Sequence, residues 1–206
     1  MKIPLRYQIT EYDCGPTSLL NGLSYLFERE EIPPEIVRSV MLFCLDRYDS
    51  AGFSGRKGTS HTAMMFLSHW LDGFGETGRL SIQSSYLSGG DVTLVQGSYL
   101  RGALYRGGVA VVRVDLDGWH YVLLTGVYED RVYVFDPYRV AAPAQLPGIE
   151  LVEDHPFAYN RVVPLACFET TQISPYAFGP YEQREAVLLF NARTALPEEQ
   201  LVDYII

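Results

Sequence analysis

A cysteine, a histidine and an aspartate occur along the chain in contexts that suit nucleophilic catalysis, and the cysteine comes first. Cys14 is followed at once by Gly15 and Pro16, and then by leucines at the spacing of an amphipathic helix. A helix is therefore predicted to begin at or just after Cys14. Proline fits the first turn of a helix, and the positive end of the helix dipole favours a thiolate over a thiol. Cys14 is a candidate nucleophile; the alternative is a small buried residue at a helix start.

A cysteine nucleophile needs a base and a group that orients the base. His120 is the candidate base, because it lies at the start of an apolar strand, where an unpaired polar residue is costly. Asp136 ends the next strand, before Pro137, and is the candidate orienting group. The alternatives are a strand-end histidine bonded to the backbone and a turn-forming aspartate–proline pair. His155, in a proline-flanked acidic loop, competes for the role of base.

Two spacings bear on how these residues meet. Gln8 lies six residues before Cys14 on a short extended or turn segment, so its side-chain amide can reach the space above the sulfur and donate to an oxyanion. His120 and Asp136 are 16 residues apart across a hairpin. They face the same side of the sheet if the turn holds an odd number of residues centred on Tyr128, and opposite sides if it holds two.

Helical patterns come first along the chain and strand patterns follow, which predicts an α+β fold. Helices are expected to begin at Cys14, Pro34 and Thr59 or Ser60, with a short one over 98–105. Strands are expected over 109–115, 119–128, 131–136, 162–168 and 186–192, the first three as an antiparallel meander.

The remaining segments carry weaker patterns. Residues 80–95 are interpreted as a loop with one or two weak strands, and 137–156 as an excursion without regular structure. We expect one domain over 1–206, mainly helical over 1–75 and mainly β over 76–206. His61 and His69 are expected to be surface or helix-packing residues on the third helix. Thr59 and its small neighbours are interpreted as loop and cap, or as the lining of a cleft beside Cys14.

The composition limits the classes of partner. The 206 residues include 25 Asp and Glu against 16 Lys and Arg, a formal net charge of −9. No run of lysines or arginines is present, so neither nucleic acid nor an anionic membrane is expected as a partner. Cys14, Cys44 and Cys167 are an odd number with wide separations, which argues against a disulfide framework and fits a reducing compartment. Cys44 lies on an apolar helical stripe and is expected in the core.

The sequence also lacks the usual signals for metals and membranes. It has no CxxC motif, and its four histidines show no metal-ligand spacing, so neither a metal nor another cofactor is expected. The N-terminus has no apolar signal segment, and no stretch approaches the length of a membrane span. We expect a cytoplasmic protein.

The motifs together resemble the bacteriocin-processing, or double-glycine leader, cysteine peptidases and their stand-alone relatives. The resemblance rests on Gln8 before Cys14 and Gly15, on Trp119-His120-Tyr121 with Leu124-Thr125-Gly126, and on Phe135-Asp136-Pro137. It implies a papain-like fold, with Cys14 as nucleophile, His120 as base, Asp136 as orienting group and Gln8 as oxyanion donor. It covers residues 8 to 137.

Three functions remain open. The first is a cysteine peptidase acting on a peptide or isopeptide bond of a peptide or protein substrate. The second is an acyltransferase or amidase with the same three residues, because such a site does not by itself choose the acceptor. The third is a catalytically silent binding domain.

Overall fold

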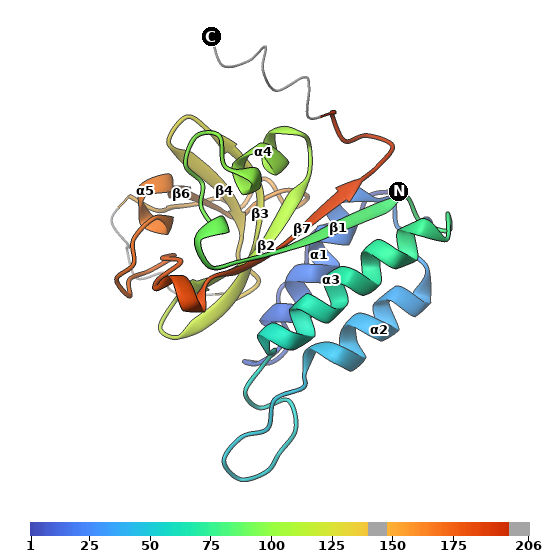
Figure 1. Ribbon diagram of the computed structural model, residues 1–206, viewed down its shortest axis with the longest axis horizontal. Coiled ribbons are helices and arrows are strands. Elements are labelled where there is room, and N and C mark those ends of the chain that lie inside the picture. The colour runs from blue at the N-terminus through green and yellow to red at the C-terminus, as the bar shows by residue number, and fades with distance from the viewer. Residues whose placement is uncertain (140–147, 198–206) are drawn as a thin grey trace.

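The structure, a computed structural model, describes residues 1–139 and 148–197. Three helices lie on one face of an antiparallel sheet, and α2 packs on both α1 and α3 (Figure 1). α1 crosses the centre of the sheet, against β2, β3 and β7, whereas α3 lies mainly against the edge strand β1. Their bounds are α1 Cys14–Leu26, α2 Pro34–Cys44 and α3 His61–Glu76. The first helix therefore begins at Cys14, as predicted.

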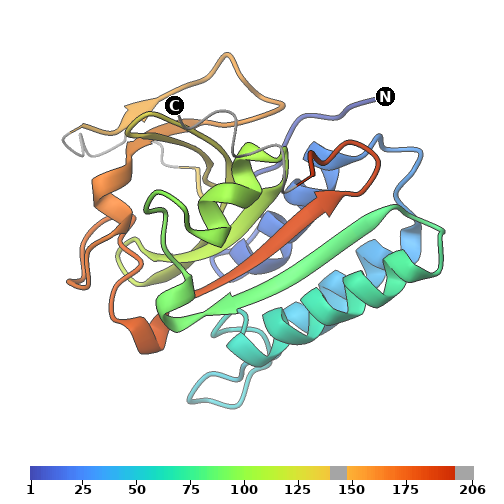
Figure 2. The ribbon, with the colours of Figure 1, turned by 45° about the horizontal axis from the view of Figure 1, so that its top comes forward.

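The sheet has seven strands among the described residues, in the order β1-β7-β2-β3-β4-β6-β5, and neighbouring strands are antiparallel. The last strand in the chain, β7, lies between β1 and β2 (Figure 2). The α+β fold and the central meander β2-β3-β4 are confirmed. The bounds are β1 Ile82–Ser88, β2 Val109–Asp115, β3 Trp119–Tyr128, β4 Arg131–Phe135, β5 Glu150–Leu151, β6 Arg161–Pro164 and β7 Glu185–Asn191.

The sheet is buried on both faces, which gives the molecule two cores. Val111 and Leu123 face the three helices, whereas Val112 and Val122 face a second core. That second core is closed by α4 (Tyr99–Tyr105) and by the segment after β6, which includes α5 (Leu165–Phe168). Burial on both faces explains why β2 begins with four consecutive apolar residues, Val109 to Val112. Each fully buried valine there contributes about 1.5–3 kcal/mol to folding.

Two expectations about secondary structure need correction, and a third, of one or two strands over 80–95, is confirmed as one strand. The expected strand over 162–168 ends at Pro164, and α5 follows, because proline has no N–H to continue a ladder. The weak strands expected over 80–95 are one strand, β1, which is stabilised by pairing along β7. The excursion 137–156 contains β5, two residues paired with β6, while its residues 140–147 lie outside the described residues.

The short helix expected over 98–105 is confirmed as α4. In the described parts of the chain, no helix is both long and apolar enough to cross a lipid bilayer.

The hairpin between β3 and β4 is the feature that aligns His120 with Asp136. Tyr128 pairs with Arg131, so the turn holds two residues, and Glu129 takes the left-handed conformation at φ 52°. An odd-numbered turn centred on Tyr128 would set His120 and Asp136 on the same face of the sheet. The observed two-residue turn would by itself set them on opposite faces. Instead, the register shifts by one residue between Leu124 and Gly126. This β-bulge offsets the even turn and returns the two side chains to one face.

Candidate active site

Cys14 is the first residue of α1 and is 8% exposed. The helix start packs closely on the loop before α3, because a Cβ atom at Gly15 would lie 2.4 Å from Thr59 Oγ1. A side chain larger than hydrogen at position 15 would therefore displace Thr59. The first N–H groups of a helix have no intrahelical acceptor and carry the positive end of its dipole. The sulfur thus lies beside unpaired donors at a partly positive helix end.

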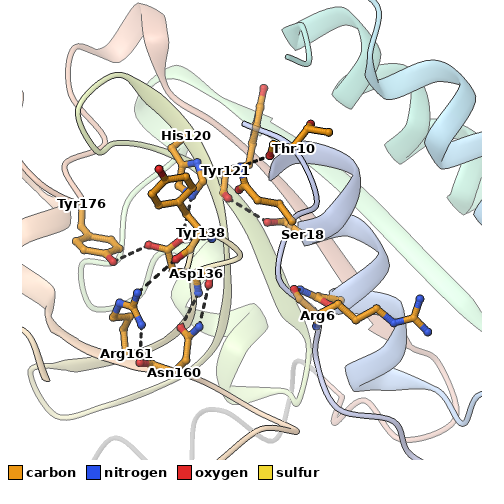
Figure 3. A network of polar contacts seen from close by, with 12 residues as sticks. Arg6, Thr10, Ser18, His120, Tyr121, Asp136, Tyr138, Asn160, Arg161 and Tyr176 are labelled. Carbon is orange, nitrogen blue, oxygen red and sulfur yellow. Dashed lines mark hydrogen bonds and ion pairs between the residues drawn. The ribbon is translucent and has the colours of Figure 1, made fainter. Parts of the chain in front are cut away.

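His120 and Asp136 are in direct contact. His120 Nε2 lies 2.9 Å from Asp136 Oδ1, and the aspartate is fully buried (Figure 3). The second ring nitrogen, Nδ1, is not bonded to Asp136, and Cys14 lies close enough to the ring to raise its pKa. Cys14 belongs to the helix-side core, whereas Asp136 is bonded to a residue of the opposite core. His120 is the second residue of β3, so it lies near the end of that strand, between the groups of the two faces.

The protonation of His120 follows from these contacts. Burial by itself lowers the pKa of His120, but the hydrogen bonds and negative charges of Asp136 and Cys14 raise it to about 10. Burial likewise raises the pKa of Asp136, and the hydrogen bond and charge of His120 hold it below its usual range. At neutral pH the ring is therefore a cation beside the Asp136 carboxylate.

Asp136 is held by residues that sequence reasoning missed. The buried Tyr176 donates its hydroxyl to Asp136 Oδ2 at 2.8 Å, and the N–H of Tyr138 donates to Oδ1 at 2.9 Å. Asn160 binds the aspartate's backbone twice, accepting from its N–H and donating to its carbonyl, each at 2.8 Å (Figure 3). Both the carboxylate and the backbone of Asp136 are thereby fixed.

Tyr176 reaches Asp136 from an uncommon backbone conformation. Its φ is 65°, in the left-handed region that bulky residues rarely adopt. The turn is fixed by two backbone bonds to the end of β2, from Tyr176 N to Asp115 O at 2.7 Å and from Asp115 N to Ala177 O at 2.9 Å. Arg161 also contacts the Tyr176 hydroxyl and donates to the carbonyl of Asn160 at 3.0 Å. No local pattern in the sequence marks Tyr176 or Asn160.

Hydrogen bonds hold both the backbone and the side chain of Gln8. Its backbone N–H donates to the carbonyl of Pro137 at 2.9 Å, which places it beside the aspartate. Its side-chain Nε2 donates to the carbonyl of Thr10 at 2.7 Å, so the second N–H of that amide remains free to donate elsewhere. Its Oε1 is buried and has no hydrogen-bond partner within the described chain. The amide is oriented with its nitrogen toward Thr10, since the reverse would set two oxygens face to face.

Asp13 folds the loop that carries Gln8 to Cys14. It is 5% exposed, and its carboxylate accepts from the N–H groups of Ile9 and Thr10 at 3.0 and 2.6 Å. The Thr10 hydroxyl adds a third bond at 2.5 Å. Burial raises the pKa of Asp13, and these bonds lower it below its usual value. Its place just before the helix was the available sequence signal, because aspartate is common there as a backbone-binding residue.

The other candidates lie apart from this site. His155, the competing base, bonds its neighbour Asp154 at 2.7 Å and stacks on Tyr159. Cys44 is fully buried in the helix-side core, as expected, and burial raises the pKa of its thiol. Burial also raises the pKa of Cys167. Among the described residues, no group of three or more His, Cys, Asp or Glu side chains could hold a metal ion.

An open cavity of about 760 Å³ borders the site through Asn160 and Arg161. It lies between the N-terminal segment, at Leu5 and Tyr7, and the segment that carries β5 and β6. Its size is that of a ligand pocket, but Cys14, His120 and Asp136 do not line it.

Neither the family models nor the curated proteins contain a match to this chain.

Proposed function

We propose that this chain is a papain-like cysteine peptidase that hydrolyses a peptide or isopeptide bond. The observation that carries the proposal is the bonded pair His120–Asp136 beside Cys14, which lies close enough to raise the pKa of the ring. With a pKa of about 10, His120 holds its proton at neutral pH, and a cation beside a cysteine favours the thiolate form of that cysteine. The triad geometry and the motifs shared with the bacteriocin-processing peptidases support the same four residues.

In the first half of the proposed reaction, Cys14 Sγ bonds to the carbonyl carbon and the carbonyl electron pair moves to oxygen. The oxyanion accepts from the backbone N–H of Cys14 and from the second N–H of Gln8 Nε2. The carbon–nitrogen bond then breaks, and the proton of His120 Nδ1 passes to the leaving amine. A thioester remains on Cys14.

In the second half, water attacks the thioester and gives a proton to His120. The carbon–sulfur bond breaks, the carboxylic acid is released, and the sulfur again faces an imidazolium. Asp136 stays ionised throughout and holds the ring in one orientation. An amine in place of water gives an amide, which is the acyltransferase alternative.

A peptide library tests the proposal. The wild-type protein is incubated with the library, with and without small amine acceptors, and the products are identified by mass spectrometry. Free carboxyl products are expected, and the Cys14→Ala variant should give none, while the matched thiol control Cys167→Ala should cleave as the wild type does. Amide products would favour the acyltransferase. If Cys14 also reacts with iodoacetamide below pH 7 no faster than an ordinary thiol of pKa about 8.5, both enzyme functions fail.

A further inference from the structure

A second cluster of polar side chains lies on the helix-facing side of the sheet, around the buried pair Arg113 and Glu185. The proposed reaction does not use it. We call it the Arg113 cluster; its members are Arg113, Glu185, Tyr121, Tyr86 and His61. Arg113 pairs with Tyr121 across β2 and β3, and Glu185 begins the neighbouring strand β7. Arg113 is 7% exposed and Glu185 is 1% exposed.

Both oxygens of the Glu185 carboxylate accept hydrogen bonds. Glu185 Oε1 accepts from the Tyr121 hydroxyl at 2.6 Å and from His61 Nδ1 at 2.9 Å. Its Oε2 accepts from the Tyr86 hydroxyl at 3.1 Å. His61 is 45% exposed, as expected for a surface residue, and its side chain also joins the buried carboxylate to an arginine.

The arginine keeps unused donors. Arg113 Nη1 donates to His61 Nε2 at 2.5 Å and to Gln183 Oε1 at 3.4 Å, and the guanidinium lies 4.6 Å from the centre of the Trp119 ring. Over residues 1–139 and 148–197, nothing accepts a hydrogen bond from its Nε or Nη2. Guanidinium has five N–H donors, so the cluster has more donors than acceptors. It suits a ligand group that accepts hydrogen bonds.

The charges of the Arg113 cluster indicate which hydrogen-bond acceptor it favours as a ligand. Arg113 lies 3.8 Å from Glu185, which offsets its charge. His61 is neutral in this arrangement, since its Nε2 accepts from the arginine while its Nδ1 donates to the carboxylate. A carboxylate ligand would meet Glu185 and a protein of net charge −9, whereas a carboxamide meets neither penalty. The favoured group is therefore the side-chain amide of Gln or Asn.

The cluster lies beside the nucleophile. Thr59, two residues before His61, packs on Gly15, and Trp119 precedes His120. Ser18 of α1 donates to the carbonyl of Tyr121 at 3.0 Å (Figure 3). Burial and the charge of Glu185 raise the pKa of Tyr121, and the negative charge of Cys14 adds to the same shift. We place the acyl part of a substrate on the side of Thr59 and His61, away from the leaving amine that His120 protonates in the proposed reaction.

We propose that Arg113, with His61 and Gln183, forms a specificity site that binds the carboxamide side chain of a Gln or Asn residue, within two residues of the scissile bond on its acyl side. The inference rests on the proposed function, because it places a substrate over Cys14. Nε and Nη2 of Arg113 donate to the amide oxygen, and the Trp119 face holds the guanidinium in place.

The test uses peptide vinyl sulfones, in which Cys14 Sγ adds to the vinyl carbon that is joined to the peptide, the double bond opens, and His120 supplies the proton to the carbon beside the sulfone. Two sets of probes carry Gln, Glu, Met or Lys, one at the residue next to the electrophile and one at the residue before it. In one set, the Gln probe should label Cys14 roughly 10- to 100-fold faster than the nearly isosteric Met probe, with Glu between them and Lys slowest.

Two variants test the role of the arginine. Arg113→Lys keeps the charge opposite Glu185 but loses the planar fork, and the double variant Arg113→Met with Glu185→Gln removes both charges together. Each should reduce the Gln-over-Met ratio to about that of the probes' free reactivity with a small thiol. Arg193→Met, an exposed control, should keep the wild-type ratio. Circular dichroism checks that each variant is folded.

The outcomes separate this inference from the proposed function. Equal rates for Gln and Met in both wild-type sets, or a preference that survives the Arg113 variants, would overturn the specificity site while leaving Cys14 reactive. If Cys14 is labelled by no probe and is not alkylated by iodoacetamide below pH 7, the proposed function itself fails.

Discussion

Two buried carboxylates approach the same sheet from its two cores, and each holds a histidine nitrogen at 2.9 Å. Asp136 accepts from His120, and Glu185 accepts from His61. The difference lies in the other nitrogen of each ring. His120 has Cys14 there, which stabilises a cation, whereas His61 has an arginine N–H, which requires a neutral ring.

The comparison shows that a histidine–carboxylate pair is not by itself the mark of a general base. The third group decides whether the ring holds a mobile proton beside a nucleophile or a fixed hydrogen bond beside a cation. Exposure differs in the same sense: the His120 side chain is 12% exposed and the His61 side chain 45%. The proposed base, His120, is largely shielded from solvent, whereas His61 in the proposed specificity site is open to solvent.

Replacing each histidine in turn should give the largest effects and should show that the two rings have different roles. His120→Ala should lower hydrolysis of the best library peptide by roughly 10⁴-fold, because the thiolate loses its cation and the leaving amine loses its acid. It should also shift the alkylation of Cys14 by iodoacetamide toward alkaline pH. His61→Ala should instead change the order of preference among the vinyl sulfone probes. Equal losses of hydrolysis in both variants would contradict the assignment of roles.

The pKa of His120 gives a second test of how its carboxylate partner acts on the ring. Its ring ¹⁵N shifts should titrate near pH 10 in the wild type, and Asp136→Asn should move the midpoint toward 6.5, because the carboxylate supplies much of the stabilisation of the cation. Since the pKa is raised in the folded state, the pair stabilises the fold fully below pH 6.5 and progressively less as the pH rises to about 10. Urea unfolding at pH 6 and pH 10 measures this loss. A wild-type midpoint below 7 would argue against the ion pair.

The oxyanion donor gives the next largest effect. Gln8→Ala should lower kcat by roughly 10² to 10³, because one donor to the oxyanion is lost. The alkylation rate of Cys14 and the thermal stability should change little, and Gln172→Ala, at an exposed position, serves as the control. Parallel losses of alkylation rate and stability would make Gln8 a structural residue.

The smallest effect comes from matched tyrosines, one at each carboxylate. Tyr176→Phe removes a donor from Asp136 and Tyr86→Phe removes one from Glu185, so each should cost roughly 1–3 kcal/mol of unfolding free energy. Only Tyr176→Phe should also change the pH dependence of Cys14 alkylation, because Asp136 acts on the thiolate through His120. The two readouts are urea unfolding and peptide mass spectrometry from pH 4 to 10. A pH profile unchanged by Tyr176→Phe would make that tyrosine a packing residue only.

Local patterns in the sequence determined the elements that carry the candidate site. The leucine spacing after Cys14 placed the start of α1, and the apolar runs around His120 and before Asp136 placed β3 and β4. These predictions worked because helix and strand periodicity is a property of adjacent residues. The four residues with proposed roles were all found in this way or by resemblance.

Only the tertiary structure decided what holds the site together. The bulge between Leu124 and Gly126, which aligns His120 with Asp136, depends on pairing between strands rather than on any one residue. Tyr176 and Asn160 come from a part of the chain without a recognisable motif, and their role appears only where the chain returns to Asp136. The acidity of His120 is decided in the same way, because burial and charges from residues far apart in sequence act on one ring.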